Sequence, residues 1–274
     1  MRLELAHVVV IGGGFVGQLI QWAMPSVRLL DWRKTAPANH LETRMVGPQY
    51  LWEPIPGVES YSFEVETLVD SAPPTPESVL AYKRKIGKEH DGGDWGLQFQ
   101  HLTTGWHSQL PTPRVEYNQH VKAVDLSGHR LRMADGRIIE YDVLLNTVPL
   151  DAFLKLCLIS PPIYTPWKQD RIYLRTETLD GSYAGMRLNY LSDPTSRFYR
   201  QTLTADKMFF ETLEPGPDVK PLPLGKIHPH PQSEDVLRAL KVFDTFCFGR
   251  FATWRPDELA HQTWQNILEW KGTL

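Results

Sequence analysis

The segment from His7 to Lys34, HVVVIGGGFVGQLIQWAMPSVRLLDWRK, constrains the fold of this chain more than any other stretch. Val8 to Ile11 is a short, continuous apolar run, which predicts a central strand of a parallel sheet that is covered on both faces. Gly12, Gly14 and Gly17 follow it as G-x-G-x-x-G. In such a turn the first glycine permits the bend, the second lets a pyrophosphate approach the backbone, and the third allows the helix to pack closely on the strand. The segment therefore predicts a dinucleotide site.

The residues after the glycine turn complete this unit. The apolar spacing predicts a helix from Phe15 to about Ala23, which Pro25 ends. Val27 to Leu30 predicts a second strand, and it leads to Asp31 at about twenty positions from Gly12, where a carboxylate binds ribose hydroxyls. Because that carboxylate repels a 2′-phosphate, the spacing favours FAD or NAD over NADP. A glycine-rich turn with a purely structural role is the alternative.

Length and charge narrow the class of protein. A chain of 274 residues buries enough surface to fold as one or two domains without a disulfide or a metal. The net charge of −3 argues against a dedicated nucleic-acid surface, although a local basic patch is compatible with it. The one dense basic cluster is Lys83, Arg84, Lys85 and Lys88. It is either a solvated helix face or a site for an anionic substrate or polyanion, so nucleic acid stays open as a partner.

Several kinds of site and location are disfavoured. Cys157 and Cys247 lie far apart and form neither a CxxC pair nor a zinc framework, which favours a reducing, cytoplasmic setting. His228 and His230 lie between prolines, so we expect surface histidines and no metal site. The first ten residues leave no room for a signal peptide, and no apolar run has the length of a membrane span. We therefore expect a cytoplasmic protein with no membrane partner.

The rest of the chain reads as mostly β structure. Tyr61 to Val69 predicts a strand, followed by a helix that starts near Pro76. A hairpin is predicted at Asp135-Gly136, and it feeds a buried strand from Tyr141 to Leu150. From Ile172 onward, the segments 172–178, 184–191, 197–203 and 207–213 predict four successive strands of an antiparallel sheet, separated by turn dipeptides.

Three motifs together resemble the flavin-containing amine oxidase superfamily. They are GGGFVG with its acid, the middle pattern LRMADGR…YDVLLNTVPL, and the late CFGRFATW. The tail and SRFYRQTL, at 196–203, are most similar to UDP-galactopyranose mutase relatives. The resemblance implies an α/β fold with a Rossmann-like, glutathione-reductase-type FAD-binding domain and a smaller antiparallel-sheet substrate domain. We expect the FAD-binding domain to comprise residues 1–60, 111–155 and 235–274, and the substrate or cap domain residues 61–110 and 156–234.

The resemblance also implies which residues hold FAD. The fingerprint would bind the ADP half, and the late Gly-Arg pair would reach the pyrophosphate or the flavin, although an ordinary core-edge arginine is the alternative for Arg250. The helix predicted from Glu258 to Trp270 would direct its N-terminus toward the flavin. The expected cofactor-binding residues are Gly12, Gly14, Phe15, Val16, Gly17, Asp31, Trp32, Arg33, Val121, Thr147, Gly249, Arg250 and Trp254.

For the reaction, the leading hypothesis is an FAD-dependent oxidoreductase that acts at the C–N bond of an amine or amino-acid-like substrate, by oxidation to an imine or lyase-type cleavage. The substrate is a small molecule or an amine on a larger carrier such as a modified nucleobase. Trp52 and Tyr190 would help to form an aromatic cage, and the expected catalytic residues are Tyr199, Arg200, Arg187 and Trp254. Strand alternation places Tyr199 and Arg200 on opposite sides.

Two alternatives remain open. One is a sugar-nucleotide enzyme like UDP-galactopyranose mutase, with reduced flavin and arginines that hold a diphosphate. The other is a non-catalytic nucleotide-binding protein on a flavoprotein fold. The chain departs from the superfamily in two respects, since Trp32-Arg33-Lys34 stands where relatives carry a second glycine pair, and the stretch available for a substrate domain is short.

Overall fold

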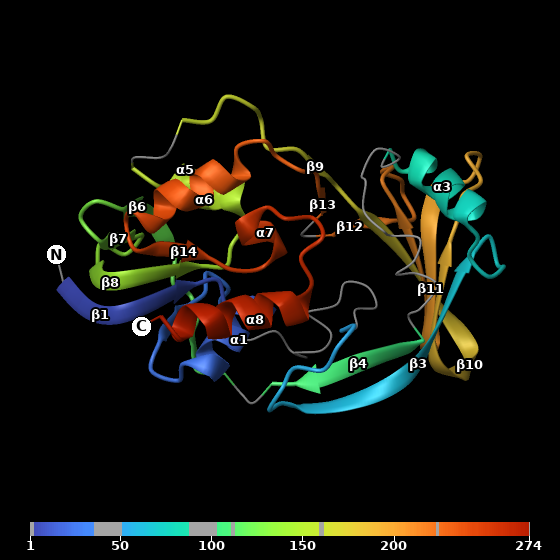
Figure 1. Ribbon diagram of the computed structural model, residues 1–274, viewed down its shortest axis with the longest axis horizontal. Helices are drawn as coiled ribbons and strands as arrows, with labels where there is room; N and C mark the ends of the chain where they lie inside the picture. Colours follow the sequence, from blue (N-terminus) through green and yellow to red (C-terminus); the bar gives the residue numbers. More distant parts are fainter. Residues whose placement is uncertain are drawn as a thin grey trace. The chain divides into compact units, whose positions relative to one another are not determined.

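The computed structural model describes residues 3–35, 51–87, 103–110, 113–158, 162–222 and 225–273, and these divide into two compact units (Figure 1). Unit 1 comprises the described residues within 1–44, 109–169 and 227–274, and unit 2 those within 45–108 and 170–226. Relative to the predicted domains, residues 51–60 fall in the second unit, and residues 109–110, 156–158, 162–169 and 227–234 fall in the first. The sequence also predicts an ordered loop over 35–56 and a turn at GGDWGLQF, 92–99; residues 36–50 of the loop and the whole turn lie outside the described residues.

Unit 1 is built on a seven-stranded sheet in the order β5-β2-β1-β8-β7-β6, with β14 also paired to β8. Strands β5, β2, β1, β8 and β14 run parallel to their partners, whereas β6, β7 and β8 form an antiparallel meander. The strands are β1 (Leu3–Ile11), β2 (Arg28–Leu30), β5 (Val115–Glu116), β6 (Val121–Asp125), β7 (Arg130–Met133), β8 (Ile138–Asn146) and β14 (Thr245–Cys247).

Turn chemistry explains the meander. Gly136 takes a positive φ of 87°, the Arg137 backbone N–H donates to Asp135, and the Met133 N–H closes the turn on the Arg137 carbonyl. The predicted hairpin is confirmed by the antiparallel pairing of β7 with β8. β8 is continuous from Ile138 to Asn146, where the sequence suggested one strand before Tyr141 and another after it.

Helices cover both faces of this sheet (Figure 1), with α5 and α6 on one side and α1 and α8 on the other. The predicted strand-turn-helix-strand unit is confirmed, since α1 spans Phe15–Ala23 and β1 pairs parallel with β2. A single apolar core joins the sheet to α5 and α6 and excludes water from Leu144, Phe153 and Leu240. The remaining helices are α5 (Leu150–Leu156), α6 (Ser233–Lys241), α7 (Arg250–Thr253) and α8 (Ala260–Lys271).

Unit 2 contains a five-stranded sheet in the order β11-β10-β3-β4, with the short β12 paired to β10. The strands are β3 (Glu59–Val69), β4 (Thr104–Gln109), β10 (Tyr173–Tyr190), β11 (Phe198–Thr212) and β12 (Lys220–Pro221); β9 (Gln169–Asp170) and β13 (Lys226–Ile227) make a separate pair. Because β3 runs parallel to β10, the sheet is mixed. The predicted antiparallel arrangement is therefore confirmed for β10 with β11 and wrong for β3 with β10.

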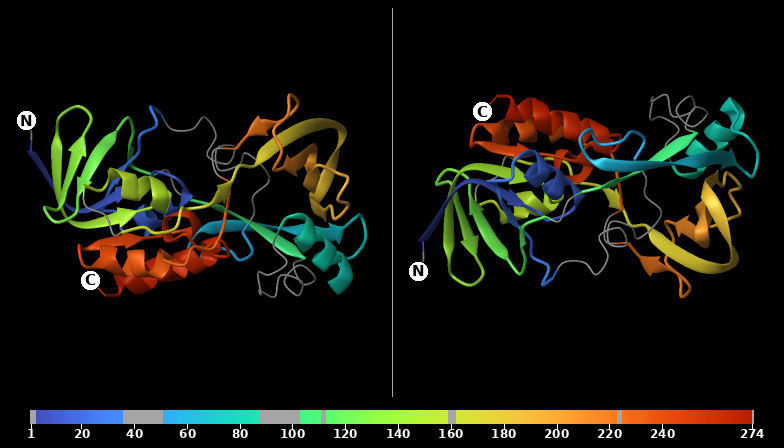
Figure 2. Two further views of the ribbon diagram at one scale, coloured as in Figure 1. Left: turned by 90° about the horizontal axis from the view of Figure 1, so that it is seen from above. Right: turned by 90° about the horizontal axis from the view of Figure 1, so that it is seen from below.

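The four strands predicted after Ile172 are two long ones. Asp180-Gly181 does not reverse the chain; instead the β10–β11 register shifts twice between Thr178 and Met186. Gly181 and Gly185 take positive φ values of 149° and 107° there, which lets an irregularity bend a strand without ending it. Both strands curve strongly along their length (Figure 2).

Helix α3 (Pro76–Lys85) covers one face of this sheet, and its start follows from local chemistry. The Thr75 hydroxyl accepts the Ser78 N–H at 3.2 Å, the Ser78 hydroxyl accepts the Thr75 N–H at 2.9 Å, and Pro76 occupies the first turn. Of the basic cluster, Lys85 donates its ammonium to the Phe198 carbonyl at 2.6 Å. The buried side chains between α3 and the sheet are Val65, Val69, Val79, Tyr82, Ile86, Met186, Leu188, Tyr190 and Tyr199.

One buried carboxylate ties the two ends of β11 together. Glu211, only 3 % exposed, accepts the Tyr199 hydroxyl at 2.6 Å and the Arg200 Nε at 2.9 Å. A straight strand would separate these residues by about 40 Å, so the contacts require a strongly bent strand. Burial opposes the charged form of Glu211, but Arg200 and the Tyr199 hydroxyl outweigh it and hold the pKa of the carboxyl below its usual value of 4.5.

Replacing Glu211 tests this ion pair. Glu211→Ala leaves the Arg200 guanidinium without its counter-ion, and we expect a loss of about 3–5 kcal/mol in the free energy of unfolding, measured with urea. Asp218→Asn, which removes the exposed partner of Arg197, is the matched control and should change stability far less. Equal losses for the two variants would contradict a buried-charge origin.

The same carboxylate predicts a pH dependence. Because the pKa of Glu211 is lower in the folded than in the unfolded chain, its contribution to stability is complete above the usual value of 4.5 and is lost as the pH falls through the lower, folded value. Urea unfolding between pH 3 and pH 6 should therefore show a fall in stability below about pH 4.5 that is shallower in Glu211→Gln. Parallel profiles for the two proteins would assign the acid sensitivity to other groups.

Candidate functional site

The glycine turn of unit 1 begins with a residue whose backbone only glycine adopts readily. Gly12 takes a φ of 103°, and its N–H donates to the Leu30 carbonyl at 2.9 Å, which ties β1 to β2. A Cβ atom there would lie 2.4 Å from the hydroxyl of Thr147. That hydroxyl lies 3.0 Å and 2.8 Å from the Ile11 and Gly12 carbonyl oxygens, so the end of β8 supports the turn.

The other two glycines of the motif differ in their surroundings. A Cβ atom at Gly17 would lie 2.0 Å from the Gly12 carbonyl oxygen, so α1 packs directly on the turn. A Cβ atom at Gly14 would meet no protein atom within 4 Å. The second glycine therefore borders open space, and the backbone is accessible to a ligand there.

The N-terminus of α1 lies at this open side. Gly14 is its N-cap in an extended conformation, and no side chain caps the helix, so first-turn N–H groups lack intrahelical acceptors. Gln18 is 3 % exposed and donates to the Gly13 carbonyl at 2.9 Å, whereas no partner of its Oε1 is present among the described residues. Exposed N–H groups and the helix dipole together favour an anion such as phosphate.

Asp31 lies at the end of β2 with its carboxylate fully engaged. It is 3 % exposed, and it accepts the backbone N–H groups of Gly13 and Arg33, both at 2.8 Å. The Arg33 guanidinium adds bonds to both oxygens, at 2.9 Å and 2.5 Å, and a further bond to the Gly13 carbonyl at 2.8 Å. A ribose hydroxyl that binds Asp31 must therefore replace a bond from the Arg33 side chain, while the backbone bonds keep the carboxylate in place.

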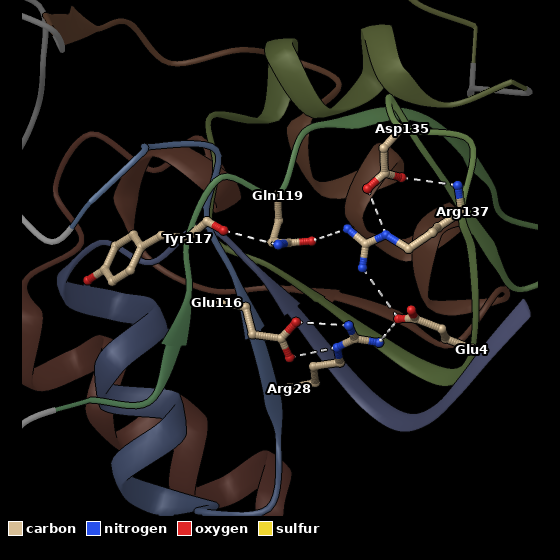
Figure 3. A network of polar contacts seen from close by, with 7 residues as sticks. All are labelled: Glu4, Arg28, Glu116, Tyr117, Gln119, Asp135 and Arg137. Carbon is tan, nitrogen blue, oxygen red and sulfur yellow. Dashed lines mark hydrogen bonds and ion pairs between the residues drawn. The ribbon is translucent and has the colours of Figure 1, made fainter. Parts of the chain in front are cut away.

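A polar network holds the strand beside Asp31 (Figure 3). Arg28 forms a bidentate pair with Glu116 at 2.7 Å and 2.8 Å, and the Glu116 carbonyl accepts the Asp31 N–H at 2.9 Å. The ring of Tyr117 points away from the network, and burial raises the pKa of its hydroxyl. The network links five segments of unit 1 through Glu4, Arg28, Glu116, Tyr117, Gln119, Asp135 and Arg137.

The late Gly-Arg pair lies against the same turn. Gly249 takes a φ of 89°, and a Cβ atom there would lie 2.7 Å from the Val16 side chain in the first turn of α1. Arg250 begins α7 and donates to the Glu258 carbonyl at 3.0 Å. The fold thus brings together Gly12, Gly14, Phe15, Val16, Gly17, Asp31, Arg33, Thr147, Gly249 and Arg250.

Two other predicted residues lie at the periphery of this group. The side chain of Trp32 is 65 % exposed next to Asp31. Val121 starts β6 two positions after Gln119, whose backbone N–H donates to the Asp31 carbonyl at 2.8 Å.

The structure corrects the role expected for Trp254. This side chain is 1 % exposed, its indole N–H donates to the His228 carbonyl at 2.9 Å, and its ring meets Trp167 edge to face at 5.0 Å. A ring without accessible surface offers no face to a ligand, so Trp254 is a core residue. His230, expected on the surface, is also buried, because its ring stacks on Trp167 at 3.7 Å.

Unit 2 carries a groove of about 370 Å³ on the sheet face opposite α3. Arg187 donates its Nε to Glu66 at 2.5 Å, and Asn189 binds both the backbone and the hydroxyl of Ser71. The groove is lined by Glu66, Leu68, Ser71, Pro73, Arg187, Asn189, Gln201, Leu203 and Met208. Its size is that of a small-molecule site.

Of the residues predicted to act on substrate, the groove contains Arg187 alone. Tyr199 and Tyr190 are 3 % and 6 % exposed beneath α3, and Arg200 is bound to Glu211. Tyr199 and Arg200 were expected on opposite sides of a regular strand. In the bent strand β11, both side chains bind the Glu211 carboxylate. Trp52 is partly buried in unit 2 and does not line the groove.

Sequence reasoning missed the other polar groups of the groove. In YSFEVETLV, Glu64 and Glu66 alternate with Phe63 and Val65, which predicts that Glu66 lies on the polar face of a strand but predicts no role for it. In the same way, Arg187 and Asn189 alternate with the buried Met186 and Leu188. The alternation in each strand predicts which residues lie on its polar face. Only the pairing of β3 with β10 shows that Glu66, Arg187 and Asn189 lie on the same face of one sheet.

Within the part of the chain that the structure describes, no group of three or more histidine, cysteine, aspartate or glutamate side chains is arranged to hold a metal ion. Among the same residues, no helix has both the length and the apolar character needed to cross a membrane.

Comparisons with known proteins identify the fold. No model of a protein family matches the sequence, and no curated protein matches it. Among solved structures, reduced UDP-galactopyranose mutase gives a TM-score of 0.64 at 13 % identity, over 98 % of this chain and 96 % of that chain. A CLA-producing fatty acid isomerase from P. acnes gives 0.58 at 11 % identity, over 96 % and 98 %. A double mutant of putrescine oxidase gives 0.50 at 10 % identity, over 94 % and 84 %.

These likenesses concern the fold, since all the identities are low. This chain therefore shares its fold with UDP-galactopyranose mutase and putrescine oxidase. The resemblance inferred from the glycine turn and the late Gly-Arg pair is therefore confirmed at the level of fold.

The surroundings of Gly14 and Gly17 predict that an added methyl group lowers the stability of the protein strongly at Gly17 and hardly at Gly14. Gly17→Ala should destabilise the protein by about 2 kcal/mol or more, because the new Cβ overlaps the Gly12 carbonyl oxygen. Gly14→Ala, with open space around it, should change the melting temperature by less than about 2 °C. Thermal unfolding followed by circular dichroism checks both, and a larger loss for Gly14→Ala would contradict the geometry.

Proposed function

We propose that this protein is an FAD-dependent enzyme that acts at the C–N bond of an amine or amino-acid-like substrate. The observation that supports the cofactor is the open backbone at Gly14, on the helix terminus that Gly249 packs against. Gly12 and Gly17 are closed off by protein atoms, so the one glycine that borders open space is the one that a pyrophosphate approaches in this motif. The parallel β2-β1-β8 arrangement with this turn supports a Rossmann-like domain of the glutathione-reductase type.

In this proposal, different residues of unit 1 bind different parts of FAD. The N–H groups of the first turn of α1, at Phe15 and Val16, bind the pyrophosphate. Asp31 binds the adenosine ribose once the Arg33 side chain gives up a bond, and Arg33 then has donors for the ribose or the adenine. Thr147 keeps the turn in shape, and Arg250 supplies positive charge near the pyrophosphate or flavin. Trp254 has no part in it.

The chemistry divides between cofactor and protein. FAD held by these residues would supply the hydride acceptor for oxidation of the carbon next to the substrate nitrogen to an imine. The side chains of this chain then have to bind and orient the substrate and exclude water, and the groove of unit 2 is the candidate for that task. Its volume of about 370 Å³ suits a small molecule or the amine-bearing end of a larger one.

The arrangement of arginines favours this reaction over a sugar-nucleotide mutase. A diphosphate needs excess positive charge, yet the two arginines among the expected catalytic residues are each paired with a carboxylate, Arg187 with Glu66 and Arg200 with Glu211. The groove therefore carries no net positive charge from its charged pair. A neutral or mixed-charge ligand fits it better than a dianion.

Flavin content tests the cofactor directly. The purified protein should show flavin absorption or take up FAD on reconstitution, and Gly14→Val should lose at least about tenfold in FAD affinity, because the new side chain enters the pyrophosphate path. The same variant should fold normally, since its backbone is extended and its surroundings are open. Arg197→Gln, in unit 2, is the control with unchanged flavin content. A colourless protein that binds no FAD would contradict the proposal.

Substrate chemistry is tested on the loaded protein. Anaerobic bleaching of the flavin by amines or amino acids supports C–N chemistry. Turnover of a UDP-sugar after reduction of the flavin would assign the mutase-like reaction instead.

A further inference from the structure

The groove of unit 2 has one charged pair on its floor. Glu66 and Arg187 are direct partners in the register of β3 and β10, and the Arg187 Nε donates to the Glu66 carboxylate at 2.5 Å. Their side chains are 46 % and 42 % exposed. Both charged groups are therefore reachable from the groove while they neutralise each other.

The remaining polar groups of the groove differ in how well they are satisfied. Asn189 is 5 % exposed, and its amide is committed to Ser71 and to the side chain of Gln201 at 3.3 Å. The Gln201 amide nitrogen instead faces the Met208 sulfur at 2.8 Å, and a thioether is a weak acceptor. Gln201 thus has a donor that a carboxylate or carbonyl oxygen would accept better.

We propose that this groove binds a compact zwitterion, with an ammonium and a carboxylate on the same carbon and an aliphatic side chain. The ligand splits the Glu66–Arg187 pair, so that its ammonium binds Glu66 and its carboxylate binds Arg187 and the Gln201 amide. As a statement about the substrate, this rests on the proposed function and names its class: an α-amino acid or a close analogue.

The charge balance of the groove selects such a ligand. A simple amine makes only the charge-assisted contact with Glu66, and a simple carboxylate makes only the contacts with Arg187 and the Gln201 amide. A zwitterion replaces both halves of the pair at once. The pair that it breaks is half-exposed and screened by water, so its loss costs little.

The apolar lining selects the rest of the ligand. Leu68, Leu203 and Met208 contribute hydrocarbon surface beside the charged pair. An aliphatic side chain would be buried against these residues, whereas a second charge there would lack a partner.

Binding to the flavin-free protein tests the proposal with three matched probes. They are L-leucine, 3-methylbutylamine, which lacks the carboxylate, and 4-methylpentanoate, which lacks the ammonium. By titration calorimetry or ligand-observed NMR, L-leucine should bind at least about tenfold more tightly than either, the factor expected for one charge-assisted contact.

Variants assign the two contacts. Glu66→Gln and Arg187→Gln should each weaken L-leucine binding by about tenfold or more, and Glu66→Gln should leave binding of 4-methylpentanoate undiminished. Arg197→Gln removes an arginine from the Arg197–Asp218 pair outside the groove and should leave L-leucine affinity unchanged. Melting curves of all three variants verify folding.

Three results would overturn the zwitterion proposal: equal binding of L-leucine and 3-methylbutylamine, an equal loss in Arg197→Gln, or no L-leucine binding at millimolar concentrations. Because leucine binding is measured on flavin-free protein, its outcome does not depend on the outcome of the FAD-binding test. Leucine binding by a protein that takes up no FAD would contradict the proposed FAD-dependent function and support the zwitterion site. FAD uptake without leucine binding would support the cofactor and contradict the zwitterion site.

Discussion

The close approach of α1 to the glycine turn is the constraint on which unit 1 depends. With a Cβ at Gly17 the helix would have to move away from the Gly12 carbonyl, and the first turn of α1 would then lose its position beside Gly14. Everything else at this site is arranged around that contact. The Thr147 hydroxyl supports the turn from β8, Asp31 accepts the Gly13 N–H from β2, and Gly249 packs on Val16 from the far end of the chain. Small residues here serve backbone-to-backbone packing, and the open space is confined to Gly14.

Three of the arginine–carboxylate pairs of unit 2 differ in environment. Arg200 and Glu211 are held with Tyr199 inside a bent strand, where the pair fixes the curvature of β11. Arg187 and Glu66 are half-exposed and line the groove on the opposite face. Arg197 and Asp218 lie outside the groove. Residue type alone does not distinguish these cases, because burial and the surrounding hydrogen bonds decide which pair is structural.

The sequence predicted correctly those turns and helices that depend on residues only a few positions apart. The glycine turn, α1, the hairpin at Asp135-Gly136 and α3 follow from spacing, turn residues and caps within a few positions. Features set by distant contacts were not predictable in the same way. The strand through Asp180-Gly181 is continuous because β10 pairs with both β3 and β11. Trp254 is a core residue because Trp167 packs against its ring and the His228 carbonyl accepts its indole N–H. The cofactor side of the site was thus visible in one short motif, whereas the groove depended on the pairing of strands more than one hundred residues apart.

The contact between Val16 and Gly249 has a consequence for biosynthesis. The strand β14 and the turn that support the glycine motif come from residues 245–249, far later in the sequence than the motif itself. During translation the glycine motif therefore remains without this support until residues 245–249 have left the ribosome. Such a large sequence separation makes closure of unit 1 a slow, late step in folding. Disruption of β14 and a block in the glycine turn, although they affect distant parts of the sequence, disturb one and the same place.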